Sequence, residues 1–393
     1  MTLQEKWDKR LAFAVCFVFV CLFVTNLSGG FSVGGAPIYE TVSVISKLAI
    51  VVVLISCLPI VVRRFNLRLL AAIVGTVVVV LAQVLFFPGL NVAFYDSLQT
   101  FMITIFPLVV CFCVMQDYGE LLRQLLIASY VISSMSVLAL VSQEANLFRG
   151  SYAMGFSNAL VLPTCCMLLQ TFNVSLIRKR RVLSLVLALL NVFMVAAYGS
   201  RGSLIAIALF FVYSIVKIPV TSRKQLTEKF ILLTALMILI VGFQTILEIS
   251  FELLNKLGIY SRTLNLLSTD LMHDSGRQQL WEIVWNAFME NPLAVRGINA
   301  DYLLINQYSH NWFLEVLYAM GGILGGLFDI WIVVRILRTL VAKQEGYSMV
   351  QVLLLFSFFP VCLWSGSIWI SMYFWPWLIS GTRRSNFGRL RRS

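Results

Sequence analysis

The residue best suited to chemistry in this sequence is a histidine at the boundary of an apolar run. The chain has two histidines, and His310 lies in the stretch QYSHNWFLEV. An imidazole titrates near neutral pH, and at a helix N-terminus the dipole keeps the ring neutral and able to accept a proton. His310 is therefore a candidate general base for removing a hydroxyl proton. The alternative, a histidine that caps the helix or bonds to its loop, is favoured by sequence statistics alone.

Two polar residues follow His310 on the expected helix. Asn311 and Glu315 are four residues apart and share a helix face, whereas His310 is offset from Glu315. We interpret Asn311 as a substrate-binding candidate beside the base and assign no role to Glu315. The other histidine, His273, is a weaker candidate because nothing around it in the sequence fixes its orientation.

Three arginines in predicted outer loops are candidates for binding an anion. Arg149 lies in a polar, glycine-containing loop, Arg201 lies between two long apolar segments, and Arg277 opens a helix of the largest loop. A guanidinium can bind phosphate oxygens through two parallel hydrogen bonds. For each arginine the alternative is a structural contact to lipid headgroups or loop carbonyls.

Arg201 has the most favourable sequence surroundings of the three. In AYGSRGSLIA, Gly202 permits a tight reversal, and either Ser200 or Ser203 can cap the next helix. The first turn of a helix offers unpaired N–H groups and a partial positive charge. Beside a guanidinium this arrangement predicts an anion site that uses Arg201, Ser200 and Gly202.

The residue types indicate neither a metal nor a nucleotide. All eight cysteines lie in apolar segments, and two histidines are too few for a clustered metal site. The phosphate-binding motifs GxxxxGK[ST] and GxGxxG do not occur in the sequence. We therefore expect chemistry carried by side chains, with no metal and no cofactor.

Composition places the chain in a membrane. It is 60% hydrophobic and 12% charged, with a mean hydropathy of +0.88. A helix needs about 20 apolar residues to cross about 30 Å of hydrocarbon, and about twelve segments qualify. This predicts an all-α polytopic membrane protein. The segments are 11–28, 43–62, 69–87, 99–115, 124–142, 159–177, 182–198, 203–220, 230–249, 312–334, 348–364 and 366–381.

The positions of the basic residues predict the topology. The net charge is +12, yet most Lys and Arg residues fall in alternate connections and at both ends of the chain. Anchoring on the cytoplasmic side accounts for this pattern, so nucleic acid is not an expected partner and both termini are expected in the cytoplasm. The predicted parts are a transmembrane bundle with helices one to nine over 1–249, an extracytoplasmic cap loop over 250–311, and helices ten to twelve with a basic tail over 312–393.

The predicted cap contains an amphipathic helix in DSGRQQLWEIVWNAFMENP. Ser275 and Gln278 have the spacing of a capping box, and Asn291 with Pro292 ends the helix. Apolar residues at helical spacing form a stripe that we expect to pack on the bundle or at the membrane interface. The stripe consists of Leu280, Ile283, Val284, Ala287 and Phe288, with Trp281 and Trp285 beside it.

The helix expected after His310 carries four glycines in the run MGGILGG, at 320–326. They form two overlapping GxxxG pairs, a spacing that lets helices approach closely in membranes. We expect close packing at these glycines to hold the helix that bears His310 rigid.

Three stretches of the sequence resemble the motifs of the O-antigen polymerase and O-antigen ligase family. They are SRGSLIA at 200–206, SGRQQLWEIVWNAFMENPLAVRGIN at 275–299 and SHNWFLEVLYAMGGILGG at 309–326. The similarity covers mainly residues 149–326. The expected layout, with one large external loop between helices nine and ten, is also similar to that of the family.

The resemblance implies a metal-independent glycosyltransferase of the bacterial plasma (inner) membrane, with its active site facing the periplasm or exterior. Its donor would be an oligosaccharide linked to a polyprenyl diphosphate such as undecaprenyl diphosphate. Arg201 and Arg277 match the arginines that hold the diphosphate in the family, and His310 matches the histidine that deprotonates the acceptor hydroxyl. Arg149 is a looser match to a further basic residue of the polymerases.

The resemblance leaves alternatives open. A polymerase extends another lipid-linked repeat unit into O-antigen or capsule polysaccharide, with membrane lipids and a chain-length regulator protein as expected partners. A ligase instead transfers the glycan to the lipid A core of lipopolysaccharide. The wording of the third stretch favours the polymerase. A lipid or solute transporter has a similar helix number, but transporters commonly show internal repeats and helices broken at the midplane, whereas the polar residues of interest here are expected at the outer rim.

Overall fold

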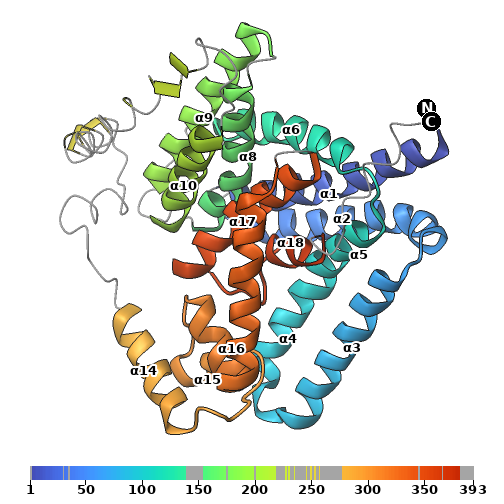
Figure 1. Ribbon diagram of the computed structural model, residues 1–393, viewed down its shortest axis with the longest axis vertical. Coiled ribbons are helices and arrows are strands. Elements are labelled where there is room, and N and C mark those ends of the chain that lie inside the picture. Colours follow the sequence, from blue (N-terminus) through green and yellow to red (C-terminus); the bar gives the residue numbers. More distant parts are fainter. Residues whose placement is uncertain are drawn as a thin grey trace.

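In a computed structural model the chain is built almost entirely of helices (Figure 1). The structure describes residues 2–29, 31–33, 36–138, 154–173, 176–198, 201–217, 277–343, 346–364 and 366–380, with isolated positions between 226 and 256. Over these residues, 8 helices are long and apolar enough to cross a membrane. The fold class expected from composition, a helical protein with several membrane-spanning segments, agrees with them. The number twelve and the sidedness stay predictions, and most of the expected segment 230–249 lies outside the described residues.

The described elements follow one another along the chain with short connections. They are α1 (Leu3–Ser28), β1 (Ser32–Val33), β2 (Ala36–Pro37), α2 (Tyr39–Arg63), α3 (Leu67–Phe86), η1 (Pro88–Leu90), α4 (Asn91–Thr100), η2 (Phe101–Ile105), α5 (Phe106–Val114), α6 (Tyr118–Met135), α8 (Met154–Phe172), α9 (Arg178–Tyr198), α10 (Arg201–Lys217), α14 (Arg277–Glu290), α15 (Ala300–Ile305), α16 (Trp312–Val341), α17 (Gly346–Trp364) and α18 (Phe374–Ser380). The two short strands pair antiparallel in a hairpin between α1 and α2.

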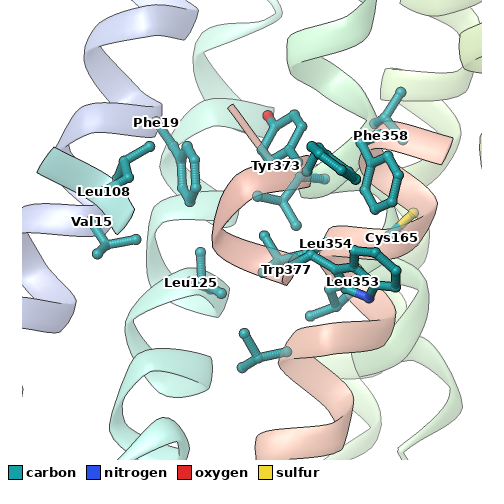
Figure 2. Packing of buried hydrophobic residues seen from close by; sticks show 14 of the residues in the cluster. Val15, Phe19, Leu108, Leu125, Cys165, Leu353, Leu354, Phe358, Tyr373 and Trp377 are labelled. Atoms are coloured by element: carbon teal, nitrogen blue, oxygen red, sulfur yellow. The ribbon is translucent and has the colours of Figure 1, made fainter. Parts of the chain in front are cut away.

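The main apolar core lies where α1, α6, α8 and α17 meet (Figure 2). Phe19 of α1, Leu125 of α6, Cys165 of α8 and Leu353 of α17 are all buried there. The 8 cysteines are free and buried, which agrees with their interpretation as small packing residues. In contrast, α2 and α3 expose apolar side chains such as Phe86, which is 73% exposed. Large exposed apolar faces on long helices are expected where lipid covers them.

One end of the bundle, which we call the basic end, is held by a buried ion pair. A guanidinium nitrogen of Arg64 lies 2.6 Å from a carboxylate oxygen of Asp8, and the same oxygen accepts the N–H of Gln116 at 2.9 Å. These bonds bring the start of α1, the end of α2 and the α5–α6 connection together. The rings of Tyr118 and Tyr347 meet nearby at 4.9 Å, so α17 also begins at this end. We call the opposite end, where α3 finishes and α16 begins, the cap end.

A second apolar cluster forms at the cap end (Figure 1). Val284 and Phe288 of α14 pack with Leu314 and Leu317 of α16 and with Leu90, which follows α3. The α14 stripe therefore packs on the bundle, as expected. Ile283, also expected in the stripe, is 45% exposed because the buried face of α14 is narrow and centres on Val284 and Phe288.

The expectation of one straight helix after His310 is wrong. Gly321 has φ 74° and ψ 165°, a conformation that breaks α16 into residues 312–320 and 322–341. The residues after α14 fill the break, because the N–H groups of Arg296 and Gly297 donate to Ala319 at 2.9 and 3.0 Å, and the N–H of Gly322 donates to Pro292 at 2.7 Å. The orphaned helix-end groups are thus satisfied by the cap.

The GxxxG interpretation of MGGILGG changes accordingly. A Cβ on Gly325 would lie 2.9 Å from the carbonyl oxygen of Val316, so this glycine lets the two parts of α16 pack against each other. A Cβ on Gly326 would meet nothing within 4 Å. Close approach does occur at these glycines, but it folds the first part of α16 back and binds the cap loop, and the spanning part begins at Gly322.

The expectation of a helix over 366–381 is also wrong. Residues 366–373 are not helical, and only α18 follows them. The physical reason is that the backbone here bonds elsewhere: the N–H of Ile368 donates to Glu315 at 3.0 Å, and the N–H of Phe374 donates to the hydroxyl of Ser371 at 3.3 Å. The segment still returns to the basic end, where Gln351 donates to the hydroxyl of Ser380 at 3.1 Å.

Candidate functional site

His310 lies in a turn whose backbone is held from both sides. Its own φ is 53°, in the left-handed region that side chains other than glycine and asparagine rarely adopt. On one side, the N–H of Ser309 donates to a carboxylate oxygen of Asp301 at 2.7 Å, and the carbonyl of Ser309 accepts the indole N–H of Trp281 at 2.8 Å. On the other side, α16 begins. The conformation of His310 is therefore imposed by three separate elements, α14, α15 and α16.

Asn311 is the N-cap of α16. Its side-chain oxygen accepts the N–H groups of Phe313 at 3.1 Å and Leu314 at 3.4 Å. The structural alternative for His310, a histidine that caps the helix, is therefore wrong in that form, because its neighbour supplies the cap. The amide nitrogen of Asn311 is the part of this side chain that a substrate could use.

An aromatic side chain packs against the imidazole. The rings of Tyr308 and His310 are edge to face, with centroids 5.3 Å apart and an angle of 88°. Burial raises the pKa of the Tyr308 hydroxyl, and the carboxylate of Glu315 raises it further. Tyr308 is thus kept protonated, so it can donate a hydrogen bond at this site without carrying a charge.

Two buried acids support the turn, and sequence reasoning gave neither a role. Asp301 is 2% exposed, and burial raises its pKa although the N–H of Ser309 opposes that shift. Glu315 is 1% exposed and accepts the hydroxyl of Ser367 and the N–H of Ile368. Asp301 thus positions the His310 turn, and Glu315 attaches the C-terminal segment to the same helix. The position of Asp301, eight residues before its partner in an irregular loop, carries no periodic signal that could have shown this.

Arg277 is brought close to this turn by helix geometry. It begins α14 and is four residues before Trp281, so the two side chains share one face of the helix about 6 Å apart along its axis. Trp281 contacts Ser309 directly, and Arg277 is partly buried on the same face as Val284. The structure therefore brings together Arg277, His310 and Asn311 among the residues predicted from sequence.

Arg201 and Gly202 begin α10, on another group of helices at the cap end. The end of α10 lies at the opposite end of the bundle, where the Lys217 ammonium donates to the carbonyl of Val341 at 3.5 Å. Ser203, one of two expected caps, is instead buried, and its hydroxyl donates to Asn158 at 2.6 Å. Arg201 is partly buried and thus rooted in a fixed contact between α10 and α8.

The remaining predicted residues lie outside the described part of the chain. These are Arg149, Ser200, His273 and the capping serine Ser275. Within the described residues, no group of three or more His, Cys, Asp or Glu side chains has a geometry that could hold a metal ion. The site as described thus consists of an imidazole, guanidinium groups and a tyrosine hydroxyl at one end of a membrane bundle, with two buried acids behind them.

Comparisons with known proteins leave the site to be judged on this geometry. The chain matches no model of a known protein family, and no curated protein is significantly similar to it in sequence.

Proposed function

We propose that the protein polymerises oligosaccharide repeat units carried on a polyprenyl diphosphate into a surface polysaccharide of the O-antigen or capsule type. The reaction would take place on the outer face of the bacterial plasma membrane. His310 is the general base, Arg201 and Arg277 hold the diphosphate, and Arg149, Ser200, Gly202 and Asn311 complete the substrate site. The resemblance of the three stretches to O-antigen polymerases and ligases supports this assignment.

The observation that carries the proposal is the backbone of His310. A non-glycine residue in the left-handed region is strained, and such strain persists only where the surroundings enforce it, most often at functional sites. Here the bonds to both backbone groups of Ser309 and the cap at Asn311 enforce it. The turn presents the imidazole beside Tyr308 at the end of the bundle that also carries Arg277.

The proposed chemistry is a glycosyl transfer. The acceptor hydroxyl gives its proton to an imidazole nitrogen of His310, and its oxygen forms a bond to the anomeric carbon of the donor sugar. The bond between that carbon and the diphosphate oxygen breaks, and the polyprenyl diphosphate leaves with the electron pair. Guanidinium groups stabilise the negative charge that develops on this leaving group.

The test uses purified protein in lipid vesicles with a polyprenyl-diphosphate-linked repeat unit as the only substrate. A ladder of elongated products is the expected result. Product that forms only after lipid A core is added would identify a ligase and overturn the polymerase assignment. Movement of the substrate across the vesicle membrane without any new glycosidic bond would identify a transporter.

The role of His310 is tested with His310→Asn. Asparagine tolerates a positive φ, so this variant preserves the turn while removing the base. We expect elongation to fall by about 100-fold or more, the usual contribution of general base catalysis. His273→Asn, at the other histidine, is the control and should elongate normally. Long-chain product from His310→Asn at the level of the control would reject the base.

A further inference from the structure

An apolar cavity of about 300 Å³ lies between α3, α4, α5 and α18. Its wall on α3 includes Ala71, Gly75, Thr76 and Val80. From Ala71 to Val80 the wall runs along α3 for about 13 Å, at a rise of about 1.5 Å per residue. The cavity is therefore elongated along the direction in which α3 crosses the bundle.

The two ends of the cavity face the two ends of the bundle. Leu378 and Ile379 line one part of it, and they directly precede Ser380, which is bonded to Gln351 near the basic end. Ile298 and Trp369 line another part, near the cap end. An elongated apolar space that runs from the cap end towards the basic end has the shape of an extended hydrocarbon chain.

Small side chains on α3 create this space and keep it reachable from the side. A Cβ added to Gly75 would meet nothing within 4 Å, and Gly75 itself is exposed. Val79, one turn further, is 45% exposed. A chain could thus enter between α3 and its neighbours from the surrounding bilayer. Because the lining is apolar, hydrocarbon rather than water is the favourable content.

The cap end of the cavity is joined to the His310 turn by hydrogen bonds. Ser97, in the cavity wall, accepts the side-chain N–H of Asn299 at 2.7 Å, and two residues later Asp301 binds the N–H of Ser309. Trp369, also in the wall, follows Ile368, whose N–H donates to Glu315 at 3.0 Å. The loops that end the cavity are thus the same loops that position the candidate site.

We propose that this cavity holds the part of the donor's polyprenyl chain nearest the diphosphate while the diphosphate lies at the arginines. The inference rests on the proposed function, because it assigns the tail of the same substrate. Its continuity with the His310 turn is what selects a chain whose headgroup reacts there, in preference to an acyl chain of a bulk phospholipid.

The first test fills the cavity with Gly75→Leu. The matched control is Gly326→Leu, also on a helix and also with open space at the Cβ, but outside the cavity. Donors with a full-length polyprenyl chain and with a short, water-soluble chain are compared. We expect Gly75→Leu to raise the KM for the long-chain donor about tenfold, the effect of losing about two buried methylene groups, and to leave the short-chain donor unaffected. An equal effect on both donors, the same change in Gly326→Leu, or no change in either variant would overturn the inference.

The second test needs no turnover, so it separates this inference from the proposed function. A polyprenyl diphosphate carrying a diazirine in its first isoprene units is photo-crosslinked to the purified protein, and labelled peptides are mapped. We expect label in 71–80 and 97–109, lost in Gly75→Leu, kept in Gly326→Leu, and competed by unlabelled polyprenyl diphosphate. Label elsewhere, or label competed equally by bulk phospholipid, would overturn the tail site. Correct labelling by a protein that makes no product would retain the tail site and reject the polymerase.

Discussion

The indole N–H of Trp281 donates a hydrogen bond of 2.8 Å to the carbonyl oxygen of Ser309, which joins α14 to the turn that carries His310. The N–H of the same serine is bound by Asp301 at 2.7 Å. Both backbone polar groups of Ser309 are therefore held by residues of the cap. The position of the imidazole depends on the docking of the cap as much as on α16.

Replacing Trp281 with phenylalanine tests this dependence. Trp281→Phe keeps an aromatic ring in the apolar cluster but leaves the carbonyl of Ser309 without the indole N–H. We expect a loss of about 1 kcal/mol in the free energy of unfolding, the usual net value of a hydrogen bond, and a larger fractional loss of elongation. Thermal unfolding in detergent and the elongation assay measure the two effects. Trp285→Phe, at a tryptophan that is 42% exposed, is the control, and equal losses in both variants would contradict the role of the bond.

The buried carboxyl of Asp301 predicts a pH dependence of stability. Because burial raises its pKa in the folded protein, the folded state binds this proton more tightly than the unfolded state. The resulting stabilisation is complete below the unfolded-state pKa, about 4, and is lost as the pH rises through the higher folded-state value. Asp301→Asn keeps an acceptor for the N–H of Ser309 but cannot ionise.

We therefore expect wild type to lose stability relative to Asp301→Asn as the pH rises above about 4, with the difference levelling off once the folded-state carboxyl is ionised. Thermal unfolding of both proteins over a pH series measures this. A difference that does not vary with pH would show that Asp301 does not bind a proton more tightly in the folded protein.

The break in α16 predicts opposite effects at two neighbouring glycines. Gly321→Ala places a Cβ 2.9 Å from the carbonyl oxygen of Leu293 in a residue with φ 74°. It should lower the free energy of unfolding by about 1–3 kcal/mol. Gly326→Ala has open space and a helical backbone, so it should be neutral or stabilising by up to about 1 kcal/mol. Thermal unfolding compares them, and equal effects would contradict the break.

Arg201 should not tolerate lysine. An ammonium is a point charge that cannot reproduce two parallel hydrogen bonds to a diphosphate, so Arg201→Lys should lower kcat/KM by about 10- to 100-fold. Arg178→Lys, at an exposed arginine that begins α9, is the matched control and should have normal activity. Full activity of Arg201→Lys would favour the alternative of an arginine that contacts lipid headgroups.

Local patterns in the sequence sufficed for the elements whose structure depends on neighbours along the chain. The helix in the cap was predicted from its apolar spacing and from the stop at Asn291 and Pro292, and α14 ends at Glu290. Its burial at Val284 and Phe288 follows from the same spacing. Hydrophobic periodicity works here because one helix face packs on a continuous apolar surface.

The features that sequence could not show depend on contacts between distant segments. The run MGGILGG is compatible with close helix packing and with a chain break, and only the loop at 292–297, which bonds to residues 319–322, decides between them. Likewise Glu315 has no partner at helical spacing, because its partners Ser367 and Ile368 are 52 and 53 residues away. Hydrogen bonds that cross such distances leave no periodic trace in a single sequence.

The pairing of Gln83 with Ile298 has a consequence for how the protein is made. The side chain of Gln83, 3% exposed, exchanges two hydrogen bonds with the backbone of a residue 215 positions later. The ribosome therefore delivers α3 to the membrane long before its partner exists. During that interval the amide must be satisfied by water or by another chain, since an unpaired amide in hydrocarbon is costly. A chain arrested before residue 298 would hold α3 incompletely anchored, which makes this helix the natural point for a chaperone or a membrane protease to inspect unfinished molecules.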